Sequence, residues 1–175
     1  PKHALRVSAY GTIDEANAAI GLVRLHTDAN SRQSAPELAE LDAMLARIQN
    51  DLFDLGADLC TPDTGEKPEW EPLRIVDAQV ARLESEIDRL NADLTPLRSF
   101  VLPGGTPAAA HLHLARTIIR RAERLMVELS MTPEETVSEP ALKYANRVSD
   151  FLFVASRWAN GKGSDEVLWV AGQNR

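Results

Sequence analysis

The chain has 175 residues, of which 44% are hydrophobic, and this is enough for one globular domain with a sizeable core. Its 19 basic and 26 acidic residues give a formal net charge of −7, which argues against nucleic acid as the main partner because phosphate contacts need a basic surface. No apolar run approaches the roughly 18 residues that can span a membrane, and the single cysteine, Cys60, excludes an internal disulfide and a multi-cysteine metal site. We therefore expect a cytoplasmic protein whose partners are neither nucleic acids nor membranes.

The first predicted helix begins near Thr12. Apolar residues recur at steps of three and four from Ile13 to Val23, as on the buried face of an amphipathic helix. Thr12 followed three residues later by Glu15 is typical of a capping box, in which the two side chains satisfy free backbone N–H groups at a helix start.

The second predicted helix has the clearest pattern in the chain. Ser34 and Glu37 predict a capping box at its start. Its apolar residues alternate steps of three and four, which is the spacing of a seam that packs inside a helical bundle. The predicted seam is Leu38, Leu41, Leu45, Ile48, Leu52, Leu55 and Leu59.

Three more helices are predicted after a polar, proline-rich loop at 60–73. The third carries apolar residues at helical spacing over 76–90. The fourth begins with Thr106 as N-cap and Pro107 as first helical residue, and the fifth covers about 138–160. The predicted core stripe of the fourth helix is Ala108, Leu112, Ala115, Ile119, Ala122, Met126 and Leu129.

The five predicted helices have short connections and show neither an internal repeat nor a domain boundary. This organisation predicts an all-α fold, a single antiparallel five-helix bundle over residues 1–175. The apolar residues at 167–170 are expected to dock on it as a strand or a turn.

A second, polar stripe lies on the fourth predicted helix, and a similar stripe lies on the fifth. The first stripe contains two arginines and no lysine, and the planar guanidinium group of arginine suits phosphate and carboxylate. Two interpretations stay open: each stripe is a solvated, salt-bridged surface, or the two face each other as a polar cleft, with Asp14 as a third contributor. The stripes are His113, Arg116, Arg120, Glu123 and Val127, and Lys143, Asn146, Asp150, Phe153 and Arg157.

Two other motifs are incomplete. Residues 161–164 resemble the end of a phosphate-binding P-loop, but Ser156 stands where that loop needs glycine, and a helix rather than a strand precedes it. None of the four histidines follows a glutamate at the Glu-x-x-His spacing of di-iron bundles. No metal-ligating set of side chains is therefore predicted.

Three sequence blocks, correctly ordered and spread over most of the chain, carry a family resemblance. The first joins Lys2 to residues 6–15 (Arg-Val-Ser-Ala-Tyr-Gly-Thr-Ile-Asp-Glu), the second covers 100–124, and the third covers 144–150. With these blocks the chain resembles the PduO-type ATP:cob(I)alamin adenosyltransferases.

The resemblance implies a five-helix bundle that forms a homotrimer, with active sites between subunits. It implies transfer of the 5′-deoxyadenosyl group of ATP, bound with Mg²⁺, to the cobalt of a reduced cobalamin or other corrinoid, with release of triphosphate. A flavoprotein-type reductase and an adenosylcobalamin-dependent enzyme are possible partners.

The resemblance also implies roles for individual residues. Arg116 and Asp14 would form a salt bridge across the subunit interface, and with Arg120 they are the expected catalytic residues. Phe100 and Phe153 would form the apolar wall on the corrinoid side. The expected ATP contacts are Lys2, Arg120, Arg121, Glu123, Arg124 and Asn146.

Two rival functions are a non-catalytic helical bundle that binds adenosylcobalamin as carrier or sensor, and a helical scaffold that binds no nucleotide. A degenerate carrier should have lost its ATP contacts first, and this chain retains them. The phosphate-binding loop of the family is expected before the position of Lys2, outside this sequence.

Overall fold

Helices dominate the part of the chain that the computed structural model describes, which is residues 1–28, 36–63, 65 and 70–175. The helical elements are α1 (Leu5–Arg24), η1 (Pro36–Leu38), α2 (Ala39–Cys60), α3 (Asp77–Asn91), α4 (Pro107–Ser130), α5 (Glu139–Trp158) and η2 (Gly161–Gly163).

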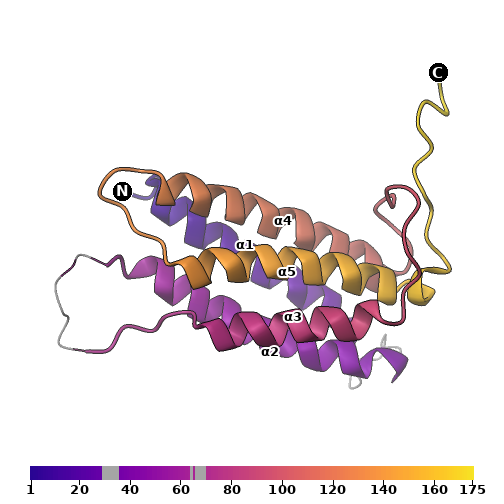
Figure 1. Ribbon diagram of the computed structural model, residues 1–175, viewed down its shortest axis with the longest axis horizontal. Helices are drawn as coiled ribbons and strands as arrows, with labels where there is room; N and C mark the ends of the chain where they lie inside the picture. The colour runs from indigo at the N-terminus through magenta and orange to yellow at the C-terminus, as the bar shows by residue number, and fades with distance from the viewer. Residues whose placement is uncertain (29–35, 64, 66–69) are drawn as a thin grey trace.

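The five long helices lie side by side as one bundle, which confirms the predicted all-α fold. Figure 1 shows that α1, α3 and α5 run in one direction and that α2 and α4 run in the other. Helix α4 packs between α1 and α5, while α2 packs on α1 and α3 packs on α5. The α3–α5 pair is therefore parallel, whereas the other main pairs are antiparallel as predicted.

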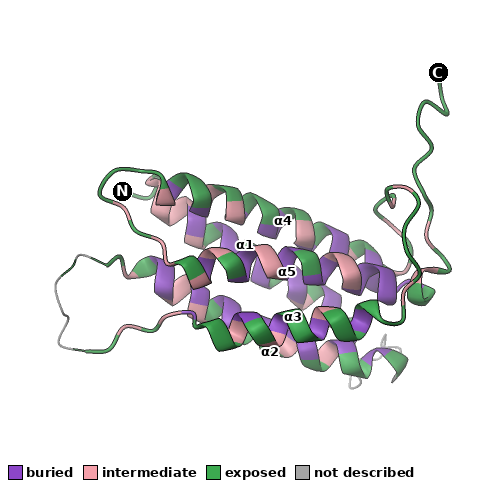
Figure 2. Cartoon of the chain, in the orientation of Figure 1, coloured by how far each residue is buried: buried purple, intermediate pink, exposed green. Residues whose placement is uncertain are grey.

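The predicted seam of α2 forms part of the core. All seven of its apolar residues are buried, and Figure 2 shows the buried residues lining the inside of the bundle. Leu38 belongs to the short helix η1, so α2 proper begins at Ala39. Ser34, the predicted capping residue, lies outside the described residues.

Two predicted helix starts are confirmed by their caps. The Thr106 hydroxyl accepts a hydrogen bond from the Ala109 N–H at 3.2 Å, and Pro107 follows as first residue of α4. Ser138 caps α5 in the same way, accepting from the Ala141 N–H at 3.3 Å. Each cap satisfies an N–H group that has no partner inside the helix.

The predicted start of the first helix is wrong. Helix α1 begins at Leu5, and Thr12 lies two turns inside it, where its hydroxyl donates to the Ser8 carbonyl at 2.7 Å. Thr12 and Glu15 therefore form no capping box. Burial of Ala9 against the other helices extends α1 beyond the clear apolar pattern, because tertiary packing overrides weak local propensity.

A buried polar cluster fixes α2 against α3 and α5. The Tyr144 hydroxyl of α5 donates to Asp51 Oδ2 of α2 at 2.8 Å, and Arg82 of α3 forms an ion pair with the same carboxylate. Burial and the adjacent Asp51 charge raise the pKa of Tyr144, which stays a neutral donor.

The C-terminal apolar segment is strand-like at one point, an isolated antiparallel bridge between Leu168 and Val101. Its partner is the segment between α3 and α4 and not a helix, so the expected docking on the bundle is indirect. No described helix has both the length and the hydrophobicity needed to cross a membrane.

The seam of α2 leads to a stability prediction. Leu52 is 1% exposed, so Leu52→Ala should lower the free energy of unfolding by about 2–5 kcal/mol, because it removes buried surface and leaves a cavity. Urea unfolding followed by circular dichroism measures this change. Leu73→Ala is the control: Leu73 is 50% exposed, and its loss should cost under about 1 kcal/mol. Equal losses would contradict the assigned core.

Candidate functional site

A pocket of about 780 Å³ lies where the last turns of α4 meet the first half of α5 and the connection between them. Both predicted polar stripes contribute to it, so the cleft interpretation is correct for this part of them. Its lining residues are Arg120, Glu123, Arg124, Val127, Glu128, Met131, Thr132, Pro133 and Asn146.

One hydrogen bond joins the two helices inside this pocket. Asn146 Nδ2 of α5 donates to Glu123 Oε1 of α4 at 2.8 Å, and Asn146 Oδ1 accepts from Arg147 Nη1 at 2.7 Å. The orientation of the Asn146 amide is therefore fixed from both sides. A preset amide and carboxylate suit a ligand that carries both donors and acceptors.

Two arginines of the pocket form no ion pair among the described residues, although Glu123 and Glu128 line the same pocket. Among the described residues, no carboxylate lies within ion-pair distance of Arg120 or Arg124, and both side chains are exposed. Neighbouring cations on one helix repel each other, so an anion in the pocket would relieve this repulsion. The planar guanidinium group makes phosphate the best-matched anion.

Arg121 is arranged differently from its neighbours. It forms an ion pair with Glu15 of α1, away from the residues that line the pocket. Lys2 is exposed just before α1, and Figure 1 places the start of α1 at the same end of the bundle as the end of α4. The structure therefore gathers Arg120, Glu123, Arg124 and Asn146 in one pocket, with Arg121 and Lys2 outside it.

The turn between α4 and α5 is held by Arg6, which sequence reasoning missed. Its guanidinium donates to Glu135 Oε2 at 3.0 and 2.6 Å, to the Leu59 carbonyl at 2.7 Å and to the Thr136 carbonyl at 2.9 Å. Since this turn supplies Pro133 to the pocket, Arg6 fixes one wall from α1. No local sequence signal reveals such long-range partners.

A second cluster lies nearer the middle of α4. The Arg116 guanidinium carbon is 5.9 Å from the centre of the Phe153 ring, and the buried His113 ring meets Phe153 edge-on at 6.4 Å. Arg116 Nε is buried and has no hydrogen-bond partner among the described residues. Burial, and then the nearby charge of Arg120, lower the pKa of Arg116.

Asp14 and Phe100 lie apart from this cluster. Asp14 is exposed on α1 and forms no ion pair with Arg116 within the described chain. Phe100 is 76% exposed beyond the end of α3, and the ring it contacts is Trp169, with centroids 5.9 Å apart. Within one chain, Asp14 and Phe100 therefore lie on surfaces separate from the cluster of Arg116 and Phe153.

Three residues of the α5 stripe have structural partners. Lys143 pairs with Glu139 and Asp150 pairs with Arg147 on the surface, as expected if this part of the stripe is a solvated, salt-bridged surface. Arg157 is buried in an ion pair with Glu166 of the C-terminal segment. These residues therefore do not belong to the pocket.

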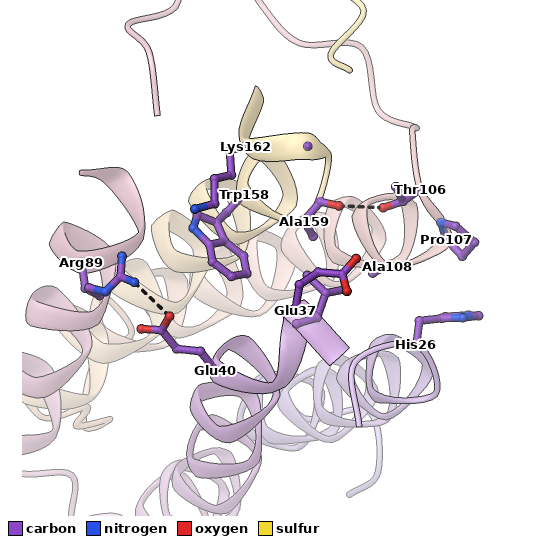
Figure 3. A pocket seen from close by; sticks show the side chains of 12 residues that line it. His26, Glu37, Glu40, Arg89, Thr106, Pro107, Ala108, Trp158, Ala159 and Lys162 are labelled. Carbon is purple, nitrogen blue, oxygen red and sulfur yellow. Dashed lines mark hydrogen bonds and ion pairs between the residues drawn. The ribbon is translucent and has the colours of Figure 1, made fainter. Parts of the chain in front are cut away.

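A second pocket, of about 770 Å³, lies at the other end of the bundle (Figure 3). Its two cations already have carboxylate partners: Arg89 donates to Glu40 at 3.0 Å, and Lys162 Nζ lies 3.0 Å from Asp93 Oδ2. It therefore offers less to an anion than the α4–α5 pocket. The described residues hold no group of three His, Cys, Asp or Glu side chains arranged to bind a metal ion.

Comparison with known proteins identifies the family. The sequence profile described as "Cobalamin adenosyltransferase" matches residues 1–159. The chain belongs to the cobalamin adenosyltransferase family. The family match covers all five helices and both clusters described above.

Several relatives align with most of this chain. A corrinoid adenosyltransferase of Mycobacterium tuberculosis is 48% identical over 172 residues, which are 97% of this chain and 82% of that protein. One from Bacillus subtilis is 40% identical over 161 residues, which are 92% and 77% of the two chains. A variant PduO-type ATP:corrinoid adenosyltransferase from Lactobacillus reuteri, solved with cobalamin and ATP, is 34% identical with a TM-score of 0.80 and covers 97% of this chain and 86% of that one.

The environment of His113 leads to a pH prediction. Burial, and then the Arg116 charge, lower the pKa of His113 below its ordinary value of 6.5, although Glu166 opposes this shift. The unfolded chain therefore binds a proton first as the pH falls below about 6.5, and the folded state loses stability at up to about 1.4 kcal/mol per pH unit.

His113→Phe, which cannot titrate, should flatten this decline in urea unfolding between about pH 7.5 and pH 5.5. His3→Phe, at an exposed position, should keep it. A decline that is identical in all three proteins would contradict the assignment.

Proposed function

We propose that this protein is a corrinoid adenosyltransferase, which moves the 5′-deoxyadenosyl group of ATP to the cobalt of cob(I)alamin or a related corrinoid. The observation that supports this most is the α4–α5 pocket, where Arg120 and Arg124 form no ion pair among the described residues and lie beside the preset Glu123–Asn146 pair. Family membership and the ATP and cobalamin bound by the Lactobacillus reuteri relative point to the same reaction.

The reaction needs no nucleophilic side chain. The reduced cobalt of the substrate attacks C5′ of ATP, a cobalt–carbon bond forms, the C5′–oxygen bond breaks, and triphosphate leaves with the electron pair. The protein must align C5′ with the cobalt and stabilise the charge of the leaving triphosphate. We assign the second task to Arg120 and Arg124, together with the Mg²⁺ ion that accompanies ATP.

We propose roles for the remaining ATP-contact residues as follows. The Asn146 amide, held by Glu123, offers a donor and an acceptor of fixed direction beside the arginines. Lys2 and Arg121 lie outside the pocket of this chain, so we place them at the edge of the bound nucleotide.

Phe100 and Phe153 form the proposed corrinoid wall. Neither side chain carries an atom that could coordinate cobalt, so an aromatic pocket keeps axial ligands away from it. Removal of an axial donor makes cobalt(II) easier to reduce to cobalt(I), because no donor pushes electron density onto the metal. A flavoprotein-type reductase is the class of partner that would supply this electron.

We further infer a homotrimer with sites between subunits. Arg116 Nε is buried without a partner among the described residues, and Asp14 is exposed without an ion pair there. An unpaired, desolvated arginine is costly, and a carboxylate from a neighbouring copy would offset this cost. A trimer in which Arg116 meets Asp14 of the next copy satisfies both groups.

The rival function is a carrier or sensor of adenosylcobalamin. Such a protein has no need of a triphosphate site, whereas the pocket keeps two arginines that form no ion pair in the described part of the chain. The rival predicts corrinoid binding without turnover, and an assay of product formation separates the two functions.

Anaerobic mixing of the full-length protein with MgATP and chemically reduced cobalamin tests the proposal. The visible spectrum of the corrinoid should change to that of adenosylcobalamin at a rate proportional to protein concentration. An unchanged spectrum with active reagents would contradict the enzymatic function.

Arg120→Ala should mainly impair the use of ATP. Loss of one charge-assisted contact costs about 1.5–3 kcal/mol, which corresponds to roughly a ten- to hundred-fold lower kcat/KM for ATP. Steady-state rates at saturating corrinoid measure this. Lys143→Ala, which removes an exposed charge paired with Glu139, is the control and should leave kcat/KM near the unmodified value. Equal values for the two variants would refute the role of Arg120.

Phe100→Ala should impair turnover of cob(II)alamin under flavin-driven reduction more than turnover of pre-reduced cob(I)alamin, because the wall is needed to ease the reduction. Parallel assays of the two substrates give the ratio of the rates. Leu102→Ala removes another exposed apolar side chain of the same loop and should change the ratio less. Equal loss with both substrates in the Phe100 variant is the outcome that argues against a corrinoid wall.

A further inference from the structure

A doubly hydrogen-bonded ion pair is buried at the end of the bundle that carries Phe100. Arg157 Nε of α5 lies 2.6 Å from Glu166 Oε1, and Nη2 lies 3.3 Å from Oε2. The two side chains are only 6% and 5% exposed. Arg157 Nη2 also donates to the Thr95 carbonyl at 2.9 Å. Arg157 of α5 is thus joined to Thr95 in the segment that follows α3 and to Glu166 in the C-terminal segment that follows η2.

The segment after α3 and the C-terminal segment hold each other beyond this anchor. The Leu102 N–H donates to the Val167 carbonyl at 2.8 Å, the Trp169 N–H donates to the Phe100 carbonyl at 2.7 Å, and the Ser99 hydroxyl donates to the Trp169 carbonyl at 2.6 Å. Figure 1 shows the two segments side by side beyond the helix ends. Phe100 is therefore placed by its pairing with the C-terminal segment.

This paired unit has little apolar attachment to the bundle. Phe100 is 76% and Trp169 46% exposed, and Val167 is exposed as well. Polar contacts near the end of α5 attach the paired segments to the bundle. Besides the ion pair, Asn160 Nδ2 donates to the Asp165 carbonyl at 3.0 Å, and the Thr106 N–H donates to Asn160 Oδ1 at 3.1 Å. The position of the Phe100 ring relative to the helices thus depends on these contacts.

A buried ion pair is a poor source of stability, because desolvation of both charges offsets their attraction, and a well-packed apolar pair is often as stable. Directional hydrogen bonds to two segments, in contrast, fix geometry. Arg157 stands one turn after Phe153, on the same face of α5. The anchor and the second aromatic residue of the wall therefore belong to one rigid helix.

We propose that Arg157 and Glu166 are positioning residues that hold the Phe100 ring in register with Phe153 for binding of the corrinoid. This inference rests on the proposed function and extends it to two residues that touch neither substrate. The step that depends on them is reduction of cobalt(II): one electron from a reduced flavin converts cob(II)alamin to cob(I)alamin, which then attacks C5′ of ATP.

The test replaces both charges together. Arg157→Met with Glu166→Leu leaves no buried charge unpaired, so the bundle should stay folded. The rate with pre-reduced cob(I)alamin should fall by less than about twofold, while the rate with cob(II)alamin and reduced flavin should fall roughly tenfold or more, because misplacement of a positioning group by about 1 Å is costly. Electron paramagnetic resonance of cob(II)alamin bound with MgATP should show more of the axially ligated form than in the unmodified protein.

The control is Arg47→Met with Glu86→Leu, which removes a partly exposed ion pair between α2 and α3. It should leave the ratio of the two rates unchanged. An unchanged ratio and resonance spectrum in the Arg157/Glu166 double variant would overturn the proposal.

A milder variant decides the question if the double variant does not fold. Glu166→Asp keeps the charge but shortens the side chain by one methylene, so it cannot reach both nitrogens of Arg157. It should lower the cob(II)alamin rate selectively, and equal effects on both rates would overturn the proposal. Absence of adenosylcobalamin from cob(I)alamin in the unmodified protein would instead refute the proposed function itself.

Discussion

Close packing of α4 between α1 and α5 is the constraint on which the rest of the structure depends. The buried face of α4 is rich in alanine, and Ala109, Ala115 and Ala122 are fully buried, which allows both neighbours to approach closely. Only the remaining surface of α4 is left for arginines, and the twist of the helix distributes them. Arg116 comes to lie against Phe153 on the α5 side, whereas Arg121 reaches Glu15 on the α1 side. The same packing therefore gives each arginine a different environment.

The proposed chemistry follows from this distribution. A phosphate site needs cations without internal partners, and the last turns of α4 supply them because the turn into α5 carries no carboxylate that pairs with Arg120 or Arg124 among the described residues. Glu135 of that turn is paired with Arg6 and does not line the pocket. The corrinoid wall needs aromatic side chains that are presented rather than buried, and a paired loop anchored by a buried ion pair presents Phe100 in this way.

Local sequence patterns predicted most of the bundle, because a seam such as that of α2 and caps such as Thr106 are properties of neighbouring residues. The start of α1 could not be predicted, since Ser8 and Gly11 weaken the local signal and burial of Ala9 by other helices decides the outcome. The site was predicted in part. The Glu123–Asn146 pair agrees with two facing stripes. The partners of the other two arginines come from distant segments, because Arg157 pairs with Glu166 and Arg121 pairs with Glu15. Only the fold shows these two ion pairs.

In the proposed mechanism, the arginines of α4 hold an intact triphosphate while the 5′-deoxyadenosyl group of ATP is transferred to cobalt. Phosphorus-31 nuclear magnetic resonance of the reaction with cob(I)alamin tests this most directly, because it identifies the inorganic product. We predict triphosphate, formed in equal amount to adenosylcobalamin and not before it. Release of ADP with orthophosphate, or of diphosphate, in step with corrinoid conversion would contradict it.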